Sequence, residues 1–389
     1  MPNFIVRLVI GTGIILAVMA AVFAPSLWNS MRGEENAPQQ QQQGVVTDAF
    51  SLQLFHALLD TEGAENPAIA PLPLTDLLLH LREISAGSTR AELERLQLSE
   101  GADAQNVVLP YGCQVAVDRD LPAGPLRTPL VTRLSLRESV PESLSLFNGM
   151  LCRASGDPDG QVVDSTILNQ GTQMLAASAT RLEPEWEHPF HPGDTLREGD
   201  FFNADGGLPH TDLMRCRAPL RVAEAADGSW QAVAVMLRAE RKGTPVAFIG
   251  ILPRGNAREF AHALTPAALS EIRAALQTAA PQDTTLEMPR INLNIPTRNL
   301  TVLVQKLGVN AIFNQQTADF SPITPQKIKL DAVLDKERLR LAENGTRGTY
   351  DGNVEYGEKH LTLNKPFVWL VADLSSPMPP LFIGLMENL

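Results

Sequence analysis

The first apolar block of the chain is continuous, without helical or strand periodicity. Residues 4–24 carry no charge apart from Arg7. About 20 such residues, each rising ~1.5 Å, span the ~30 Å hydrocarbon core of a bilayer. We therefore expect residues 1–30 to hold one transmembrane helix. A cleaved signal peptide is the alternative, but Pro25 would directly follow the cut, which favours an uncleaved anchor.

A polar segment separates this block from the rest of the chain. Residues 31–44 contain a run of glutamines and no apolar periodicity, which is typical of a flexible linker. Arg7 and the amino terminus place positive charge on the N-terminal side of the apolar block. This charge bias favours a cytoplasmic N-terminus and an extracytoplasmic body, periplasmic or extracellular, formed by residues 45–389.

Within the body, the period of the apolar positions changes along the chain. Phe and Leu recur at helical spacing in residues 50–59 and 77–81. Further on, residues 230–237 and 246–252 are rich in β-forming side chains on either side of a Lys-Gly turn signal, which predicts a hairpin. Residues 366–372 read as a buried strand. Helices followed by strands, without regular alternation, predict an α+β fold with antiparallel sheets.

The charge of the chain limits its possible partners. A formal net charge of −12 and a pI near 5.1 are accompanied by scattered basic residues. Nucleic acid binding needs clustered Lys and Arg, so we expect no nucleic acid partner. The apolar fraction of 44% is sufficient for a large core.

Few residues are arranged for chemistry. Cys113, Cys152 and Cys216 form an odd, sparse set that is typical of small buried side chains, although one disulfide is compatible with an exported body. His188 and His191 lack a third metal ligand in the sequence. No nucleophile elbow and no phosphate-binding glycine loop is present. We therefore expect no enzyme activity, no cofactor, no metal and no small-molecule substrate.

Five motifs follow one another from residue 186 onward. Residues 186–190 read WEHPF, 288–291 read MPRI and 303–313 read LVQKLGVNAIF. Residues 318–321 read ADFS, and the C-terminal segment 364–389 begins NKPFVWLVAD. In this order, the motifs resemble those of the serpin superfamily of serine protease inhibitors.

The resemblance extends over residues 45–389, with a poorly matching stretch from 100 to 165. It implies one domain of three mostly antiparallel sheets and eight or nine helices. It also implies a mechanism in which an exposed loop is cut by a protease and then inserts as a new strand into the main sheet. The strained sheet drives that insertion, while the protease supplies the chemistry.

The reactive loop implied by the resemblance covers residues 343–363 and is about four residues shorter than usual in the family. Its hinge begins at Glu343, Gly345 and Thr346. If alternate residues face inward after insertion, Gly348 and Tyr350 do so. The small residues usual at these positions are thus partly replaced by a bulky phenol that needs a buried hydrogen-bond partner.

Two counts give two positions for the bond that a protease would cut. Counting from the hinge places it at Lys359, followed by His360, which suits a trypsin-like protease. Counting back from residue 364 places it at Glu355, followed by Tyr356, which suits an acid-preferring protease. The counts disagree because the loop is short, and both positions stay open.

The family also controls opening of its main sheet through a hydrogen-bonded set of side chains called the shutter. The resemblance assigns Ala70, Pro73, Ser178 and Leu330 to these positions. Only Ser178 has a side chain that can form a hydrogen bond. We therefore expect a dry, apolar shutter in a sheet that is no longer adapted to open.

Two functional hypotheses follow. In the first, the chain is a protease inhibitor displayed on the outer face of a membrane, with a protease as partner. In the second, it is a non-inhibitory serpin-fold module or scaffold that binds another envelope protein. The altered loop and shutter favour the second hypothesis.

Overall fold

Fourteen β-strands and seven α-helices lie within the part of the chain that the computed structural model describes. This part comprises residues 49–61, 65–96, 98, 109–138, 140–158, 161–169, 171–238, 246–344, 356–375 and 379–389. Contacts between residues group Val46–Leu389 into one compact unit. The predicted α+β class is confirmed, and the seven described helices compare with the eight or nine that the resemblance implied.

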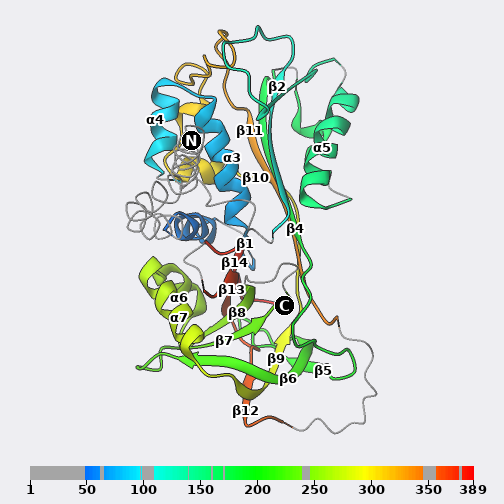
Figure 1. Cartoon of the computed structure of the whole chain (residues 1–389), viewed down its shortest axis with the longest axis vertical. Helices are drawn as coiled ribbons and strands as arrows, with labels where there is room; N and C mark the ends of the chain where they lie inside the picture. Colours follow the sequence, from blue (N-terminus) through cyan, green and yellow to red (C-terminus); the bar gives the residue numbers. More distant parts are fainter. Residues whose placement is uncertain are drawn as a thin grey trace, which may run out of the picture. The chain divides into compact units, whose positions relative to one another are not determined.

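A five-stranded sheet forms the upper part of this unit in Figure 1. Its strand order is β10 (Ile291–Asn299), β11 (Ala332–Leu341), β4 (Met174–Leu182), β2 (Tyr111–Asp118) and β3 (Val131–Leu134). The two strands β11 and β4 pair in parallel through eight positions, from Ala332 opposite Leu175 to Leu339 opposite Leu182. The centre of this sheet is therefore closed, with no strand between β11 and β4.

The other strands form a nine-stranded sheet. Its main path is β1 (Ala68–Ile69), β14 (Phe382–Met386), β13 (Phe367–Asp373), β8 (Val246–Pro253), β7 (Trp230–Met236), β6 (His210–Glu224), β9 (Gln282–Pro289) and β12 (Lys359–Thr362), and β5 (Leu196–Asp200) also pairs with β6. Strand β6 pairs with β9 over residues 213–220 and with β7 over residues 221–224. This shared strand joins two groups of strands, which explains why the described residues form two hydrogen-bonded sheets where three were expected.

The five-stranded sheet is covered on both faces (Figure 1). Helices α3 (Pro71–Glu83) and α4 (Gly87–Arg95) lie on one side and α5 (Val140–Ser155) on the other. Helix α3 tolerates prolines at its start because the first amide groups of a helix need no intrahelical acceptor. Leu77, Leu78 and Leu81 of α3 are buried, while Phe147 and Leu151 of α5 pack in a separate core cluster.

The predicted hairpin is present. Strands β7 and β8 pair antiparallel from Trp230 opposite Pro253 to Met236 opposite Ala247, but the predicted turn between them lies outside the described residues. Three further helices are α6 (Ala257–Ala263), α7 (Pro266–Thr278) and α8 (Thr301–Lys306). Helices α6 and α7 contact the nine-stranded sheet, and α8 contacts β11. The helix predicted at 50–59 covers residues 49–59.

The predicted anchor in residues 1–30 and the linker in 31–44 precede the first described residue. From residue 49 onward, none of the described helices has the length and apolar character needed to cross a bilayer. Cys113, Cys152 and Cys216 form no disulfide with one another.

Candidate functional site: a loop fixed at both ends and a buried ionic cluster

The start of the loop is fixed by side chains of the WEHPF motif, the MPRI motif and Thr195. The indole Nε1–H of Trp186 donates a hydrogen bond of 2.8 Å to the carbonyl oxygen of Ala342, directly after β11. The Glu343 side chain, only 6% exposed, accepts two hydrogen bonds from Arg290, at 2.7 and 2.6 Å, and one from the Thr195 hydroxyl at 2.7 Å. The predicted hinge residue Glu343 is thus held as a charged, fully bonded group.

The electrostatics of Glu343 agree with this geometry. Burial by itself would raise the pKa of its carboxyl group, but the hydrogen bonds from Arg290 and Thr195 and the Arg290 charge outweigh burial and lower the pKa. The middle of the loop, residues 345–355, lies outside the described residues. Of the predicted positions, Gly345, Thr346, Gly348, Tyr350 and Glu355 all fall in this segment.

The end of the loop is fixed by backbone pairing. Lys359 and His360 are the first residues of β12, which pairs in parallel with Thr284 and Thr285 of β9. His360 Nε2 lies 3.0 Å from an oxygen of the buried Glu287. A segment whose backbone is paired in a sheet is a poor substrate for proteolysis, so this pairing disfavours a cut between Lys359 and His360.

Tyr356 lies just before this paired segment. Its ring is 53% exposed and its centroid is 4.8 Å from that of the His360 ring. The guanidinium carbon of Arg215 lies 5.5 Å from the centre of the same ring. Tyr356 therefore lies outside the paired strand that contains Lys359 and His360.

The region predicted to be the shutter contains a buried ionic cluster, which we define as Ser178, Arg298, Asp335 and Glu337. Ser178 of β4 donates a 2.7 Å hydrogen bond to Asp335 of β11. Arg298 of β10 lies 3.2 Å from Asp335 and 3.1 Å from Glu337. The side chains of Asp335 and Glu337 are 2% and 0% exposed. Side chains from three strands thus meet in the closed centre of the sheet.

The backbone at the start of α3 completes the ionic cluster. The Ala70 amide donates a 2.8 Å hydrogen bond to Glu337, and Arg298 donates one of 3.0 Å to the carbonyl oxygen of Ala68. The cluster therefore connects the five-stranded sheet to the segment that leads into α3.

The prediction of a dry, apolar shutter is wrong. Ser178 does form a hydrogen bond, as its side chain allowed, and Ala70 contributes its backbone amide. Pro73 lies within α3. Leu330 is buried before β11 begins and its amide bonds to Ile312, so it does not face Ser178. The residue opposite Ser178 in the strand register is Asp335.

In the ionic cluster one guanidinium, that of Arg298, faces two carboxyl groups. Burial raises the pKa of Glu337 well above its usual range; the Arg298 charge opposes this shift and the Asp335 charge adds to it. Glu337 therefore retains a proton to a higher pH than an exposed glutamate does.

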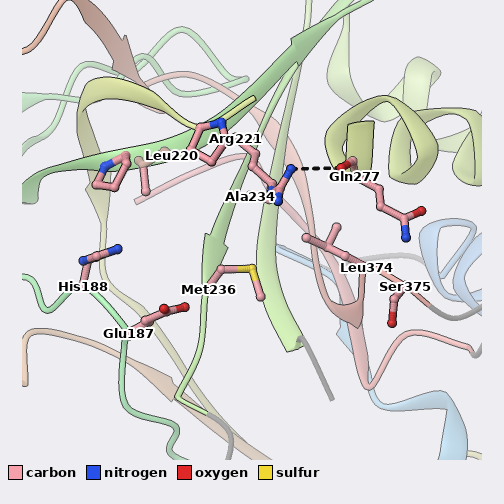
Figure 2. Close-up of a pocket in the computed structure, with 11 residues that line it drawn as sticks. Glu187, His188, Leu220, Arg221, Ala234, Met236, Gln277, Leu374 and Ser375 are labelled. Carbon is pink, nitrogen blue, oxygen red and sulfur yellow. Dashed lines mark hydrogen bonds between the residues drawn. The ribbon is translucent and has the colours of Figure 1, made fainter. Parts of the chain in front are cut away.

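A further cavity lies elsewhere, beside β6, β7 and α7 (Figure 2). It has a volume of about 540 Å³ and includes Glu187, His188 and Arg221 in its lining. Arg221 donates hydrogen bonds to the carbonyl oxygens of Gln277 and Ala279, at 2.9 and 2.6 Å. Its guanidinium group therefore caps the C-terminal end of α7. Within the described residues, neither His188 nor His191 belongs to a group of side chains close enough to hold a metal ion.

Taken together, these features describe a loop that leaves the end of a central strand and is fixed at both ends. Proteins that present a loop to a protease share this arrangement. Residues 159–389, more than half of the chain, match the family model described as Serpin (serine protease inhibitor), so the chain belongs to the serpin family. Serpins inhibit proteases and are not catalysts, which agrees with the prediction that the chain is not an enzyme.

Individual relatives are distant. Human Serpin A9 is 25% identical over 239 residues, which cover 59% of this chain and 55% of that protein. The chain thus spans about half the length of such curated relatives. Serine protease inhibitor 88Ea of Drosophila melanogaster is 19% identical over 392 residues, and this alignment covers 87% of this chain and 89% of that protein.

Solved structures establish the fold. Serpin-12 of Manduca sexta superposes with a TM-score of 0.72 at 20% identity, over 88% of this chain and 98% of that chain. Maspin superposes with a TM-score of 0.76 at 16% identity, over 90% of this chain and 99% of that chain. At such identities the likeness concerns the fold only.

Proposed function

We propose that this chain inhibits a serine-type protease by presenting residues 343–363 as bait and then inserting the cleaved loop between β11 and β4. The observation that carries the proposal is the direct parallel pairing of β11 with β4, with the loop starting at the end of β11. An inserted strand would lie between these two and be antiparallel to both.

The ionic cluster supports this proposal because it makes the closed sheet costly. Taking charges out of water costs several kcal/mol per ion, and replacement of a buried ion pair by apolar side chains is often neutral or stabilising. Arg298 shared between Asp335 and Glu337 is such an arrangement, with one cation for two carboxylates. A closed sheet that buries this cluster has free energy to release when it opens.

The length of the loop also supports the proposal. Residues 345–355 supply eleven positions, whereas β11 and β4 pair through eight. A cut after Glu355 would leave enough chain to fill the opening without first detaching β12.

A specific observation also favours the non-inhibitory alternative, in which the chain is a binding module or scaffold for another envelope protein. Lys359 and His360 are tied into the sheet by β12. If the bait had to include them, β12 would need to separate from β9 before a protease could bind. The sequence also predicts that Tyr350, a bulky side chain, lies in the inserting segment. This prediction likewise favours the non-inhibitory alternative.

The test uses two proteases and two variants. The full-length chain is incubated with a trypsin-like and with a glutamate-specific protease, and each product is run on a denaturing gel. The glutamate-specific protease should give a covalent complex that Glu355→Gln abolishes and Lys359→Gln preserves. If both proteases cut within residues 343–363 without any complex, the scaffold alternative replaces the inhibitor.

We also propose that residues 4–24 anchor the chain in a membrane, with the body on the extracytoplasmic side. The uncharged run interrupted only by Arg7, followed by Pro25, supports this proposal. Membranes from expressing cells should retain the chain after alkaline carbonate extraction, and N-terminal sequencing should begin before residue 4. A soluble chain that begins near residue 25 would show a cleaved signal peptide instead.

A further inference from the structure

Three metal-ligating side chains meet at the edge of the five-stranded sheet, on the face covered by α3. Asp76 and His80 lie one helical turn apart on α3, and Cys113 faces them from β2. One ligand atom from each residue lies within 4.8 Å of the other two. The Cys113 Sγ atom is 3.5 Å from His80 Nδ1.

The distance between Cys113 Sγ and His80 Nδ1 fits tetrahedral coordination of a metal ion. With metal bonds of about 2.3 Å to sulfur and 2.1 Å to nitrogen, the two ligand atoms of a tetrahedral site lie ~3.6 Å apart. The observed separation of 3.5 Å is close to that value before any ion is present. Thiolate, imidazole and carboxylate are together a ligand set for Zn²⁺ and chemically similar divalent ions.

A neighbouring residue orients the carboxylate. The Tyr111 hydroxyl donates a 2.8 Å hydrogen bond to Asp76 Oδ2. This bond fixes one oxygen and leaves the other for an ion, as the supporting hydrogen bonds around metal sites do.

A cavity of about 500 Å³ gives access to two of the three residues, Asp76 and Cys113. Asp76, Tyr111 and Cys113 line it together with Met150 of α5. The cavity provides an entry path and space for water as a fourth ligand. Zn²⁺ with one thiolate and one carboxylate is electrically neutral, which suits partly buried residues.

We propose that Asp76, His80 and Cys113 form a binding site for Zn²⁺ or a similar divalent ion, with a fourth position open to the cavity. On binding, the Cys113 thiol releases its proton to solvent and its sulfur forms the metal bond. Burial lowers the pKa of His80, which keeps the imidazole neutral and able to ligate. Burial raises the pKa of the Cys113 thiol, so without an ion this cysteine is not a reactive nucleophile.

The competing explanation is a simple hydrogen bond between the Cys113 thiol and the His80 ring. The two explanations differ in one observable property. A thiol–imidazole pair has no reason to bind Co²⁺, whereas the proposed site should bind one Co²⁺ per chain and give tetrahedral visible bands with a thiolate-to-cobalt band in the near ultraviolet.

The experiment titrates Co²⁺ into the metal-free, full-length chain without a polyhistidine tag and follows the absorption spectrum. Cys113→Ser should remove the thiolate band, and Asp76→Asn and His80→Gln should each weaken binding strongly. Tyr111→Phe keeps all three ligands and should weaken binding about 10-fold. Added Zn²⁺ should displace Co²⁺ and bleach the bands.

Cys152→Ser and His188→Gln are the matched controls and should leave the spectrum unchanged. Circular dichroism of each metal-free variant checks its fold, and Tyr111→Phe provides a second test should Cys113→Ser not fold. An unaltered chain without saturable Co²⁺ binding, or a thiolate band that survives in Cys113→Ser, overturns the proposal.

Discussion

Two glutamates near the loop show how the same side chain takes opposite roles six residues apart. Glu337 lies in the middle of β11 and Glu343 just after its end, and their side chains are 0% and 6% exposed. Each contacts an arginine. Yet the pKa of Glu337 is raised, chiefly by burial, whereas at Glu343 hydrogen bonds outweigh burial and lower the pKa.

The difference lies in the hydrogen bonds that each carboxyl group accepts and in how deeply the second carboxyl group beside the arginine is buried. Arg290 gives Glu343 two hydrogen bonds, and Thr195 adds a third. Asp212 also approaches Arg290, at 3.5 Å, but is more exposed and is bonded to Arg197 as well. Arg298 is divided between Glu337 and Asp335, which are both deeply buried. Glu343 is thus well bonded, while Glu337 and Asp335 compete for one guanidinium in the sheet centre.

The largest effect is expected from Arg298→Met, which leaves two buried carboxylates without a cation. Loss of one partner from a buried ionic group typically costs about 3–5 kcal/mol, so the free energy of unfolding should fall by this amount in denaturant titration. Arg340→Met, at an exposed position of the neighbouring strand β11, is the control and should change the free energy of unfolding by less than about 0.5 kcal/mol. Equal losses in both variants would remove the special role of the cluster.

A smaller effect is expected from Glu343→Gln at the hinge. The variant keeps an acceptor for Thr195 but loses the charge that binds Arg290. Hydrogen bonds to charged groups contribute about 1.5–3 kcal/mol, and the 38% exposure of Arg290 reduces this, so a loss of about 1–2 kcal/mol is expected. Limited proteolysis should also become faster near residue 343, and an unchanged rate would argue against the hinge assignment.

The smallest change in stability is expected from Glu337→Gln, because glutamine still accepts the Ala70 hydrogen bond. At pH 5 the free energy of unfolding should change by less than about 1 kcal/mol. The dependence on pH, however, should separate the two glutamates clearly.

The signs of the two pH dependences are opposite. The folded pKa of Glu337 lies above its ordinary value of 4.5, so its contribution to stability is complete below that pH and is lost as pH rises through the folded pKa. The folded pKa of Glu343 lies below 4.5, so its contribution is present above that pH and is lost as pH falls. Glu337→Gln should therefore reduce the fall in the free energy of unfolding at higher pH. Glu343→Gln should reduce the fall in the free energy of unfolding at acid pH. The reverse assignment would contradict the account.

The sequence predicted the fold well because its signals are local and ordered. The runs of β-forming residues in 230–237 and 246–252 form β7 and β8, and the WEHPF motif contains Trp186, which bonds to Ala342. The assignment of Glu343 to the hinge rests on a local motif of the same kind and stays a prediction. Such motifs can be read without knowledge of strand register.

The ionic cluster was missed because it depends on register. Ser178, Arg298 and Asp335 come from three strands, and only the pairing of β11 with β4 brings Asp335 opposite Ser178. A signal was nevertheless present. Val333, Asp335, Glu337, Leu339 and Leu341 alternate along one face of β11 and all are buried, so the two carboxylates occupied positions on an otherwise apolar face.

The metal-ligating group was missed for a similar reason. Asp76 and His80 have the spacing of one helical turn, but Cys113 lies in a stretch where the sequence pattern was weak. Only the packing of α3 on β2 brings the thiol to the imidazole.

The central claim is that the closed β4–β11 pair can open and accept the loop. Thermal unfolding of the full-length chain before and after a single cut within residues 345–355 tests it most directly. The account predicts a large rise in melting temperature after the cut, because the inserted loop completes the sheet and relieves its strain. An unchanged or lower melting temperature would contradict it and identify the closed sheet as the final, stable form of the protein.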